Sequence, residues 1–354
     1  MKILIIGPDS LTELILVEAL VAQLYKRHRC DIDLLIPENL HSLIARFPGI
    51  HKVFPLPQDR HSLKLHQSCL KLGISLRTQG YYQAINLQSQ FAYSFIPFIA
   101  GIHRRTASYP NKRHYFPHIR LTNDHRFNPL LIQGQVYGRQ LDHLLSLSCE
   151  PGSVLSEKVR PQLISHDAER QALLSRRHLE AGVKPLLVVC AGQDGSASKH
   201  WPANLFASII TEKMGAGWQV WLMGADEDKR FGAEMERLVN REEGAEFTNL
   251  TGALSLLETV DLLSLADAVL ALDNGLMHMA CALRRAVVAL YGPSSPGYRP
   301  PLTKHFQVLT QGLACKPCGE SICPRHLGVC LNYQRPELVL DALAKLPQPL
   351  FENQ

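Results

Sequence analysis

Several segments of the chain place residue types that suit phosphate binding directly after a short apolar run. Asp273, Asn274 and Gly275 follow the run 268–272 and precede a stretch with helical spacing that contains His278. The N–H groups and the dipole at a helix N-terminus favour phosphate oxygens, and a glycine there lets a ligand approach the backbone. The segment predicts a phosphate site, although an Asp or Asn that caps the helix for stability alone explains the same pattern.

Two further segments have the same arrangement. The loop 191–201 follows the apolar run 186–190, and its small residues and hydroxyls, Ser196 among them, can cradle a diphosphate that Lys199 would neutralise. The loop lacks the Gly-Lys-Ser/Thr ending of a Walker A loop, and a surface loop with a solvated lysine is the alternative. The acids Asp226, Glu227 and Asp228 follow the run 218–223, where an acid could hold ribose hydroxyls or else complement a helix dipole.

A carboxylate near the N-terminus is the candidate general base. Asp9 and Glu13 lie just beyond the apolar run 2–6, at the carboxyl end of the first predicted strand. A carboxylate at this place could accept a proton from an attacking hydroxyl. The alternative is a helix cap followed by an acid in the first helical turn.

A basic stretch in the first half of the chain could bind an anionic ligand. It contains Arg104, Arg105, Lys112 and Arg113, with tyrosines between them. Guanidinium and ammonium groups of this kind grip phosphate or carboxylate groups. A solvated basic face is the alternative.

Four cysteines, Cys315, Cys318, Cys323 and Cys330, follow one another with the spacing C-x2-C-x4-C-x6-C. Four thiols this close together can hold one zinc or iron ion tetrahedrally. Redox-sensitive thiols and disulfides remain alternatives to a structural metal. In none of these cases do we expect the cysteines to take part in catalysis.

The bulk composition narrows the class of protein. The 354 residues suit two domains of roughly 150 to 180 residues each, and 46% hydrophobic and 19% charged residues are typical of a folded chain. The net charge of +5 is too small to predict nucleic-acid binding. Neither a signal peptide nor an apolar run of membrane-spanning length is evident, so we expect a cytoplasmic protein that could still contact the inner membrane surface.

Apolar runs and helical spacing alternate twice along the chain. The first series is a strand, a helix and a strand at 2–6, 11–25 and 31–36. The second series has strands at 186–190, 218–223, 268–272 and 286–291, with helices at 202–214, 259–266 and 277–283 between them. This pattern predicts two doubly wound α/β domains, joined between about residues 150 and 184. Ligands of such domains bind at the carboxyl ends of the strands.

These segments together resemble the ADP-heptose:lipopolysaccharide heptosyltransferases, and the heptosyltransferase II branch more than others. The resemblance rests on the start MKILIIGP, on Lys199-His200-Trp201-Pro202, on the segment from Asp273 to His278, and on the stretch 290–296. It implies the GT-B fold, two Rossmann-like domains facing a central cleft. An acceptor-binding domain would span 1–165, a donor-binding domain 166–335 and a C-terminal helix or tail 336–354.

The resemblance also implies the chemistry, an inverting transfer of heptose from ADP-heptose to the lipopolysaccharide inner core without a metal. Lys199 would neutralise the leaving diphosphate, with Glu13 as the base. The donor would contact Ser196, Asp228, Asp273, Asn274, Gly275 and His278. The phosphorylated acceptor would contact Asp9, Arg104, Arg105, Lys112 and Arg113.

One departure from the family pattern concerns the base. The family has a glycine and an aspartate where this chain has Thr12 and Glu13. A carboxylate is retained, one methylene longer. Transfer to another acceptor, such as a protein or a different glycan, and a non-catalytic nucleotide-sugar binding protein therefore remain alternatives.

Overall fold

The computed structural model describes residues 1–59, 61–107, 119–121, 140–148, 159–192, 200–240, 246–324 and 328–347. The described residues divide between Gln162 and Leu163 into two compact units. Among the described helices, none combines the length and the apolar character that a membrane span requires.

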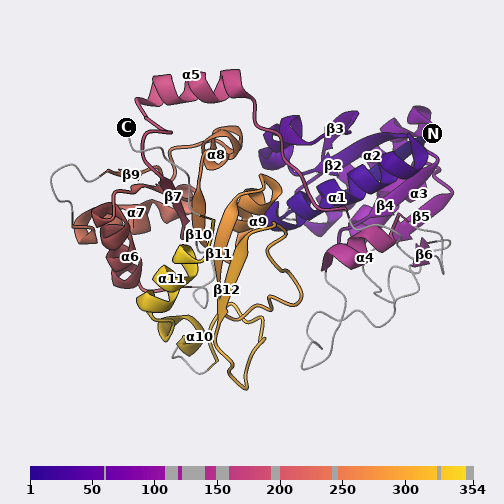
Figure 1. Ribbon diagram of the computed structural model, residues 1–354. Coiled ribbons are helices and arrows are strands. Elements are labelled where there is room, and N and C mark those ends of the chain that lie inside the picture. The colour runs from indigo at the N-terminus through magenta and orange to yellow at the C-terminus, as the bar shows by residue number, and fades with distance from the viewer. Residues whose placement is uncertain are drawn as a thin grey trace. The chain divides into compact units, whose positions relative to one another are not determined.

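Each unit is a doubly wound α/β domain, as the alternating pattern predicts (Figure 1). Within the described residues, each sheet has six parallel strands, in the orders β3-β2-β1-β4-β5-β6 and β12-β11-β10-β7-β8-β9. Numbered within its own unit, the second order is the same as the first. Both orders reverse direction beside the unit's first strand, and this switch point is where such folds bind ligands.

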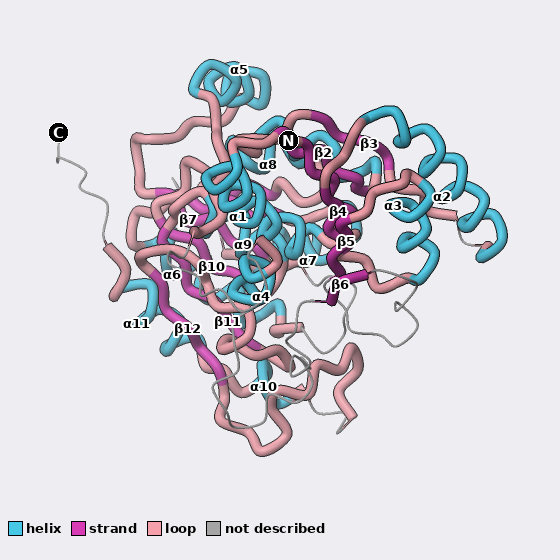
Figure 2. The backbone as a smooth tube through the Cα atoms, turned by 90° about the vertical axis from the view of Figure 1, so that its right-hand side faces the viewer, coloured by secondary structure: helices cyan, strands magenta, loops and turns pink. Residues whose placement is uncertain are grey.

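The first unit begins with an apolar strand that is buried on both faces, because helices cover the sheet. Figure 2 shows β4, β5 and β6 of this sheet side by side. The strands are β1 (Lys2–Ile6), β2 (Asp31–Ile36), β3 (Lys52–Pro55), β4 (Gln83–Asn86), β5 (Arg104–Ala107) and β6 (Ile119–Leu121). The helices are α1 (Leu11–His28), α2 (Ser62–Leu76), α3 (Phe95–Ile99) and α4 (Gln140–Ser146), with 3-10 turns at Glu38–Arg46, Arg77–Gln79 and Phe91–Ser94.

The second unit repeats this plan around a core that includes the buried Trp201 and Phe206. Its strands are β7 (Leu186–Cys190), β8 (Gln219–Met223), β9 (Phe247–Asn249), β10 (Ala268–Leu272), β11 (Ala286–Tyr291) and β12 (Phe306–Thr310). Its helices are α5 (Asp167–Arg177), α6 (Ala203–Gly215), α7 (Lys229–Leu238), α8 (Leu256–Leu263), α9 (Gly275–Ala282), α10 (Val329–Asn332) and α11 (Pro336–Ala344). The C-terminal α11 packs against α6, β11 and β12 and so belongs to this core.

Two neighbouring backbone amides mark the division between the units. The N–H of Gln162 donates to Oε2 of Glu18 at 2.6 Å, and this buried carboxylate lies on α1 of the first unit. The next N–H, that of Leu163, donates to the carbonyl of Ala282 at 3.2 Å, at the end of α9 in the second unit. The chain is therefore hydrogen-bonded to the first unit at Gln162 and to the second unit at Leu163.

A buried ionic network fastens the amino-terminal edge of the first sheet. Asp33 is fully buried and accepts hydrogen bonds from the Tyr81 hydroxyl at 2.6 Å and the His51 ring at 2.8 Å. The Lys2 ammonium lies 3.1 Å from its Oδ2. Burial alone would raise the pKa of Asp33, but the hydrogen bonds from Tyr81, His51 and Lys2 outweigh it and lower the pKa.

Candidate functional site

Asn274 ties two strands together at the switch point of the second unit. It is buried, and its Oδ1 accepts a hydrogen bond from the Met277 N–H at 3.0 Å, so it caps α9. Its Nδ2 donates to the carbonyls of Cys190 at 3.2 Å and Gly192 at 3.0 Å, just beyond β7. The capping alternative is thus confirmed for Asn274. The same side chain also holds the end of β10 against the end of β7.

Asp273 and His278 lie buried beside this cap. Nε2 of His278 is 3.5 Å from Oδ1 of Asp273, and the side chains are 1% and 5% exposed. Within the part of the chain that the structure describes, neither ring nitrogen of His278 has a hydrogen-bond partner. Buried polar atoms are nearly always satisfied, so the imidazole suits a ligand group that supplies the missing partner. Burial and the charge of Asp273 raise the pKa of the neighbouring Tyr291.

Asp228 joins the same edge of the sheet from the end of β8. Its Oδ2 accepts from the Ala225 N–H at 2.8 Å, and the residue is 8% exposed. A Cβ on Gly192 would lie 2.9 Å from this oxygen, and one on Gly224 would lie 2.7 Å from it. Glycine at both positions therefore lets two strand ends close around one carboxylate. Burial lowers the pKa of His200, and the nearby charge of Asp228 partly offsets the effect.

The structure describes five of the predicted donor residues, but it does not describe Ser196 or Lys199. The structure brings Asp228, Asp273, Asn274, Gly275 and His278 to the carboxyl edge of one sheet. Ser196 and Lys199 lie outside the described residues, as do Lys112 and Arg113 of the basic stretch.

In the first unit, Glu13 lies in the first turn of α1, as the alternative of a helix cap and a first-turn acid predicts. Ser10 caps this helix by accepting the Glu13 N–H at 3.3 Å. Oε1 of Glu13 accepts a hydrogen bond from Nε2 of Gln140 at 3.1 Å. Asp9 precedes the helix, is exposed, and lies near Tyr93, whose pKa burial chiefly raises to about 12.

The backbone before α1 is also held in place. Nε2 of the buried Gln88 donates to the Gly7 carbonyl at 2.7 Å. A Cβ on Gly7 would lie 2.7 Å from the Ile36 side chain, so β2 requires a glycine here. The loop that leads to Glu13 therefore lies tightly against both neighbouring strands, β2 and β4.

The structure does not bring Arg104 and Arg105 together with Glu13. Both residues open β5, and Arg104 pairs in register with Gln83, at the start of β4. Glu13 follows the opposite, carboxyl end of the sheet. Arg104 donates to the Tyr82 hydroxyl at 3.0 Å, whereas Arg105 is buried and donates to the Ile102 carbonyl at 2.9 Å. Burial lowers the pKa of Arg105, as expected for a guanidinium packed inside the domain.

Three of the four cysteines, Cys318, Cys323 and Cys330, lie close enough for two of them to influence the ionisation of the third. Burial raises the pKa of the Cys330 thiol, Lys316 lowers it, and Cys318 and Cys323 raise it. Among the described residues, however, no three metal-ligating side chains surround a point that could hold an ion. Nζ of Lys316 donates instead to the Tyr291 carbonyl at 2.8 Å, which ties this segment to the end of β11.

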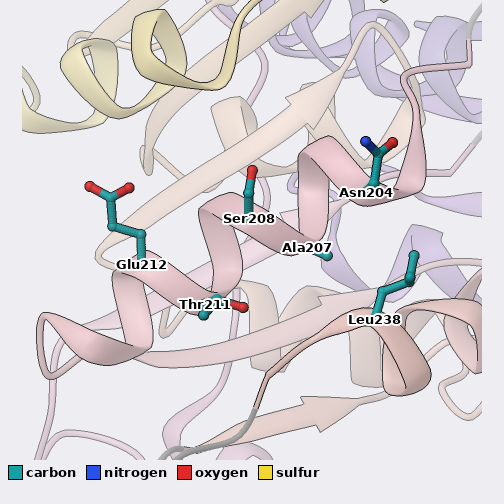
Figure 3. Close-up of a pocket in the computed structure, with 6 residues that line it drawn as sticks. All are labelled: Asn204, Ala207, Ser208, Thr211, Glu212 and Leu238. Carbon is teal, nitrogen blue, oxygen red and sulfur yellow. The ribbon is translucent and has the colours of Figure 1, made fainter.

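Two hollows on the second unit differ in character. One, of about 550 Å³, is lined by His200 and Trp201 and by charged side chains of α7, including Arg230 and Glu234. The other, of about 410 Å³, lies between α6 and Leu238 (Figure 3). Asn204, Ser208 and Glu212 line it from successive turns of α6. The first hollow adjoins the strand end that carries Asp228, whereas the second is lined mainly by exposed side chains of one helix.

Sequence reasoning missed Gln140, Gln88 and the two glycines that surround Asp228. Gln140 lies 127 positions from Glu13, and no local spacing links the two residues. Gly192 and Gly224 each follow a predicted strand, so their places were visible. Their shared contact with one carboxylate became evident only with the strand order.

Similarity to known proteins agrees with this architecture. The family model described as glycosyltransferase family 9 (heptosyltransferase) matches residues 69–327. Lipopolysaccharide heptosyltransferase 2 of Salmonella typhimurium is 31% identical over 316 residues, 87% of this chain and 88% of that protein. Lipooligosaccharide heptosyltransferase 2 of Haemophilus influenzae is 32% identical over 318 residues, with the same coverage.

Solved structures of similar proteins have the same fold. The ADP-heptose lipopolysaccharide heptosyltransferase II of Escherichia coli has a TM-score of 0.82 at 27% identity, covering 97% of this chain and 98% of that one. A family 9 glycosyl transferase of Veillonella parvula has a TM-score of 0.80 at 17% identity, covering 96% and 95%, which bears on the fold alone. The two doubly wound domains and the match to the Escherichia coli heptosyltransferase place the chain in the GT-B class of fold. Within that class, the chain belongs to glycosyltransferase family 9.

Proposed function

We propose that this enzyme transfers heptose from ADP-heptose to the inner core of lipopolysaccharide, with inversion at the anomeric carbon. The names of two bacterial relatives, heptosyltransferase 2, support heptose transfer to the lipopolysaccharide, and the name of the Escherichia coli structure supports ADP-heptose as the donor. The single observation that carries the donor half is the buried cluster of Asp228, Asp273, Asn274 and His278 at the switch point of the second unit.

The donor half of the mechanism concerns the leaving group. Negative charge grows on the diphosphate as the anomeric C–O bond breaks. The N–H groups at the start of α9, fixed by the Asn274 cap, and the ammonium of Lys199 stabilise that charge. His278 offers a buried imidazole to a donor oxygen, and Asp228 accepts the ribose hydroxyls. Ser196 adds a hydroxyl beside the phosphates. None of these steps uses a cofactor.

The acceptor half concerns proton removal. Glu13 takes the proton of the attacking hydroxyl as the new C–O bond forms on the face opposite the diphosphate. Asp9 lies four residues earlier, before α1 begins, and contacts the acceptor saccharide. Of the basic stretch, Lys112 and Arg113 are the residues that we propose for the acceptor phosphates. Arg104 and Arg105 lie at the far edge of the sheet.

Three finer points complete the proposal. The enzyme acts in the cytoplasm, at the inner surface of the membrane that holds its lipid-linked acceptor. Cys315, Cys318, Cys323 and Cys330 carry no structural metal in this proposal, because among the described residues no three metal-ligating side chains surround one point. The donor-binding domain begins near Leu163 and includes α11.

A calorimetric titration followed by a turnover assay tests this proposal. ADP and ADP-heptose should bind more tightly than UDP-GlcNAc or GDP-mannose, and ADP-heptose should be consumed with a heptosyl-Kdo acceptor. Transfer to other acceptors only would reject the lipopolysaccharide assignment. Binding without turnover on any acceptor would indicate a nucleotide-sugar binding protein. No preference for adenine would reject the donor.

A further inference from the structure

Gln140 is a buried amide that no phosphate-binding or acid–base motif accounts for. It begins α4, is 6% exposed, and donates from Nε2 to Oε1 of Glu13 at 3.1 Å. A hydrogen bond to a carboxylate is stronger than one between neutral groups, and burial of the amide limits competition from water.

The helix that carries Gln140 is fixed along α1. The two helices pack together and lie side by side in Figure 1. Leu141, Leu144 and Leu145 of α4 are buried. At the other end of the pair, the Arg27 guanidinium of α1 donates to the Ser148 carbonyl at 2.9 Å. The packing of these leucines therefore sets the position of α4 along α1, and with it the position of the Gln140 amide, whereas the Arg27 bond holds the chain just beyond the far end of α4.

The length of the glutamate side chain makes this support necessary. Glu13 has one more rotatable bond than an aspartate at the same place, so its carboxylate can occupy more positions. Ordering a long side chain costs conformational entropy, and catalysis depends on the orientation of the base. We propose that Gln140 is a positioning residue that orients the Glu13 carboxylate toward the acceptor hydroxyl. This inference rests on the proposed role of Glu13 as the base.

Gln140→Met and Arg27→Met form a matched pair for the test. Methionine keeps roughly the length of glutamine but removes the donor. Each variant removes one hydrogen bond that joins α1 to α4 or to the residues directly after it, but only the first removes the bond to Glu13. We expect Gln140→Met to lower kcat about 10- to 100-fold, with KM for ADP-heptose within about twofold of wild type. Arg27→Met should lose as much thermal stability and keep its kcat.

A double mutant separates positioning from packing. In a Glu13→Ala background, Gln140→Met should change kcat by less than about twofold, because no carboxylate remains to be oriented. If Gln140→Met does not fold, Gln140→Glu replaces it. This change keeps the size but sets a second carboxylate beside Glu13, so kcat should again fall.

The possible results are distinct. An unchanged kcat in both Gln140 variants, an equal loss in Arg27→Met, or an undiminished effect of Gln140→Met in the Glu13→Ala background would overturn the inference. A wild-type kcat in Glu13→Ala itself would instead reject Glu13 as the base, and with it that part of the proposed function.

Discussion

At the scale of single residues, Glu13 differs from its family pattern and yet occupies an ordered place in α1. We expect Glu13→Gln to lower kcat by about 10²- to 10⁴-fold, because the amide cannot accept the proton of the acceptor hydroxyl. ADP affinity in calorimetry should not change. Glu38→Gln, the same change at an exposed first-turn acid of the same unit, serves as the control and should keep its kcat. Equal rates for both variants would contradict the role of Glu13.

Gly224 tests the other half of the site. An added Cβ would lie 2.8 Å from the Cβ of Asp228, so the backbone around this carboxylate must shift. We expect Gly224→Ala to weaken ADP binding at least about tenfold, or about 1.4 kcal/mol, in calorimetry. Gly215→Ala is the control, because a Cβ there meets nothing within 4 Å. Unchanged ADP affinity in Gly224→Ala would remove Asp228 from the donor site.

At the scale of elements, the caps of the helices are local features whose effect can be measured alone. Ser255 and Glu258 form a capping box at the start of α8, with hydrogen bonds of 3.3 and 2.8 Å. Ser255→Ala should lower the free energy of unfolding by about 1 kcal/mol in a urea titration and leave kcat unchanged. Ser208→Ala, on the exposed face of α6, should change stability by less than about 0.5 kcal/mol. A loss of kcat in Ser255→Ala would mean that α8 takes part in the site.

Some strands could be predicted from the sequence and others could not. The central strands β1, β7, β10 and β11 are continuous apolar runs, because helices cover both faces of a parallel sheet. Strand β5, next to the edge strand β6, and the edge strand β9 read Arg-Arg-Thr-Ala and Phe-Thr-Asn, and nothing in such short polar segments indicates a strand. The donor cluster was predictable because its residues directly follow central strands. The contact of Gln140 with Glu13 depends on how α4 packs, which no local pattern contains.

At the scale of the whole molecule, the Asp33 network should make stability depend on pH. The folded-state pKa of Asp33 lies below that of the unfolded chain, so its contribution is complete above about pH 4 and is lost as the pH falls through the folded value. Asp33→Asn should lower the free energy of unfolding by about 3–5 kcal/mol at pH 7, because the Lys2 charge loses its partner. Urea titrations should show this difference shrinking toward pH 3. A constant difference would exclude ionised Asp33 as the cause.

The two amides at Gln162 and Leu163 have a mechanical consequence. The nitrogen of Gln162 is bound to the first unit and that of Leu163 to the second, and only two rotatable backbone bonds separate them. Any rotation of one unit relative to the other through this connection must therefore be absorbed by φ and ψ of Gln162, unless a hydrogen bond breaks. Rotation at this connection is thus confined to the two backbone dihedral angles of Gln162, and Glu18 anchors its nitrogen to the first unit.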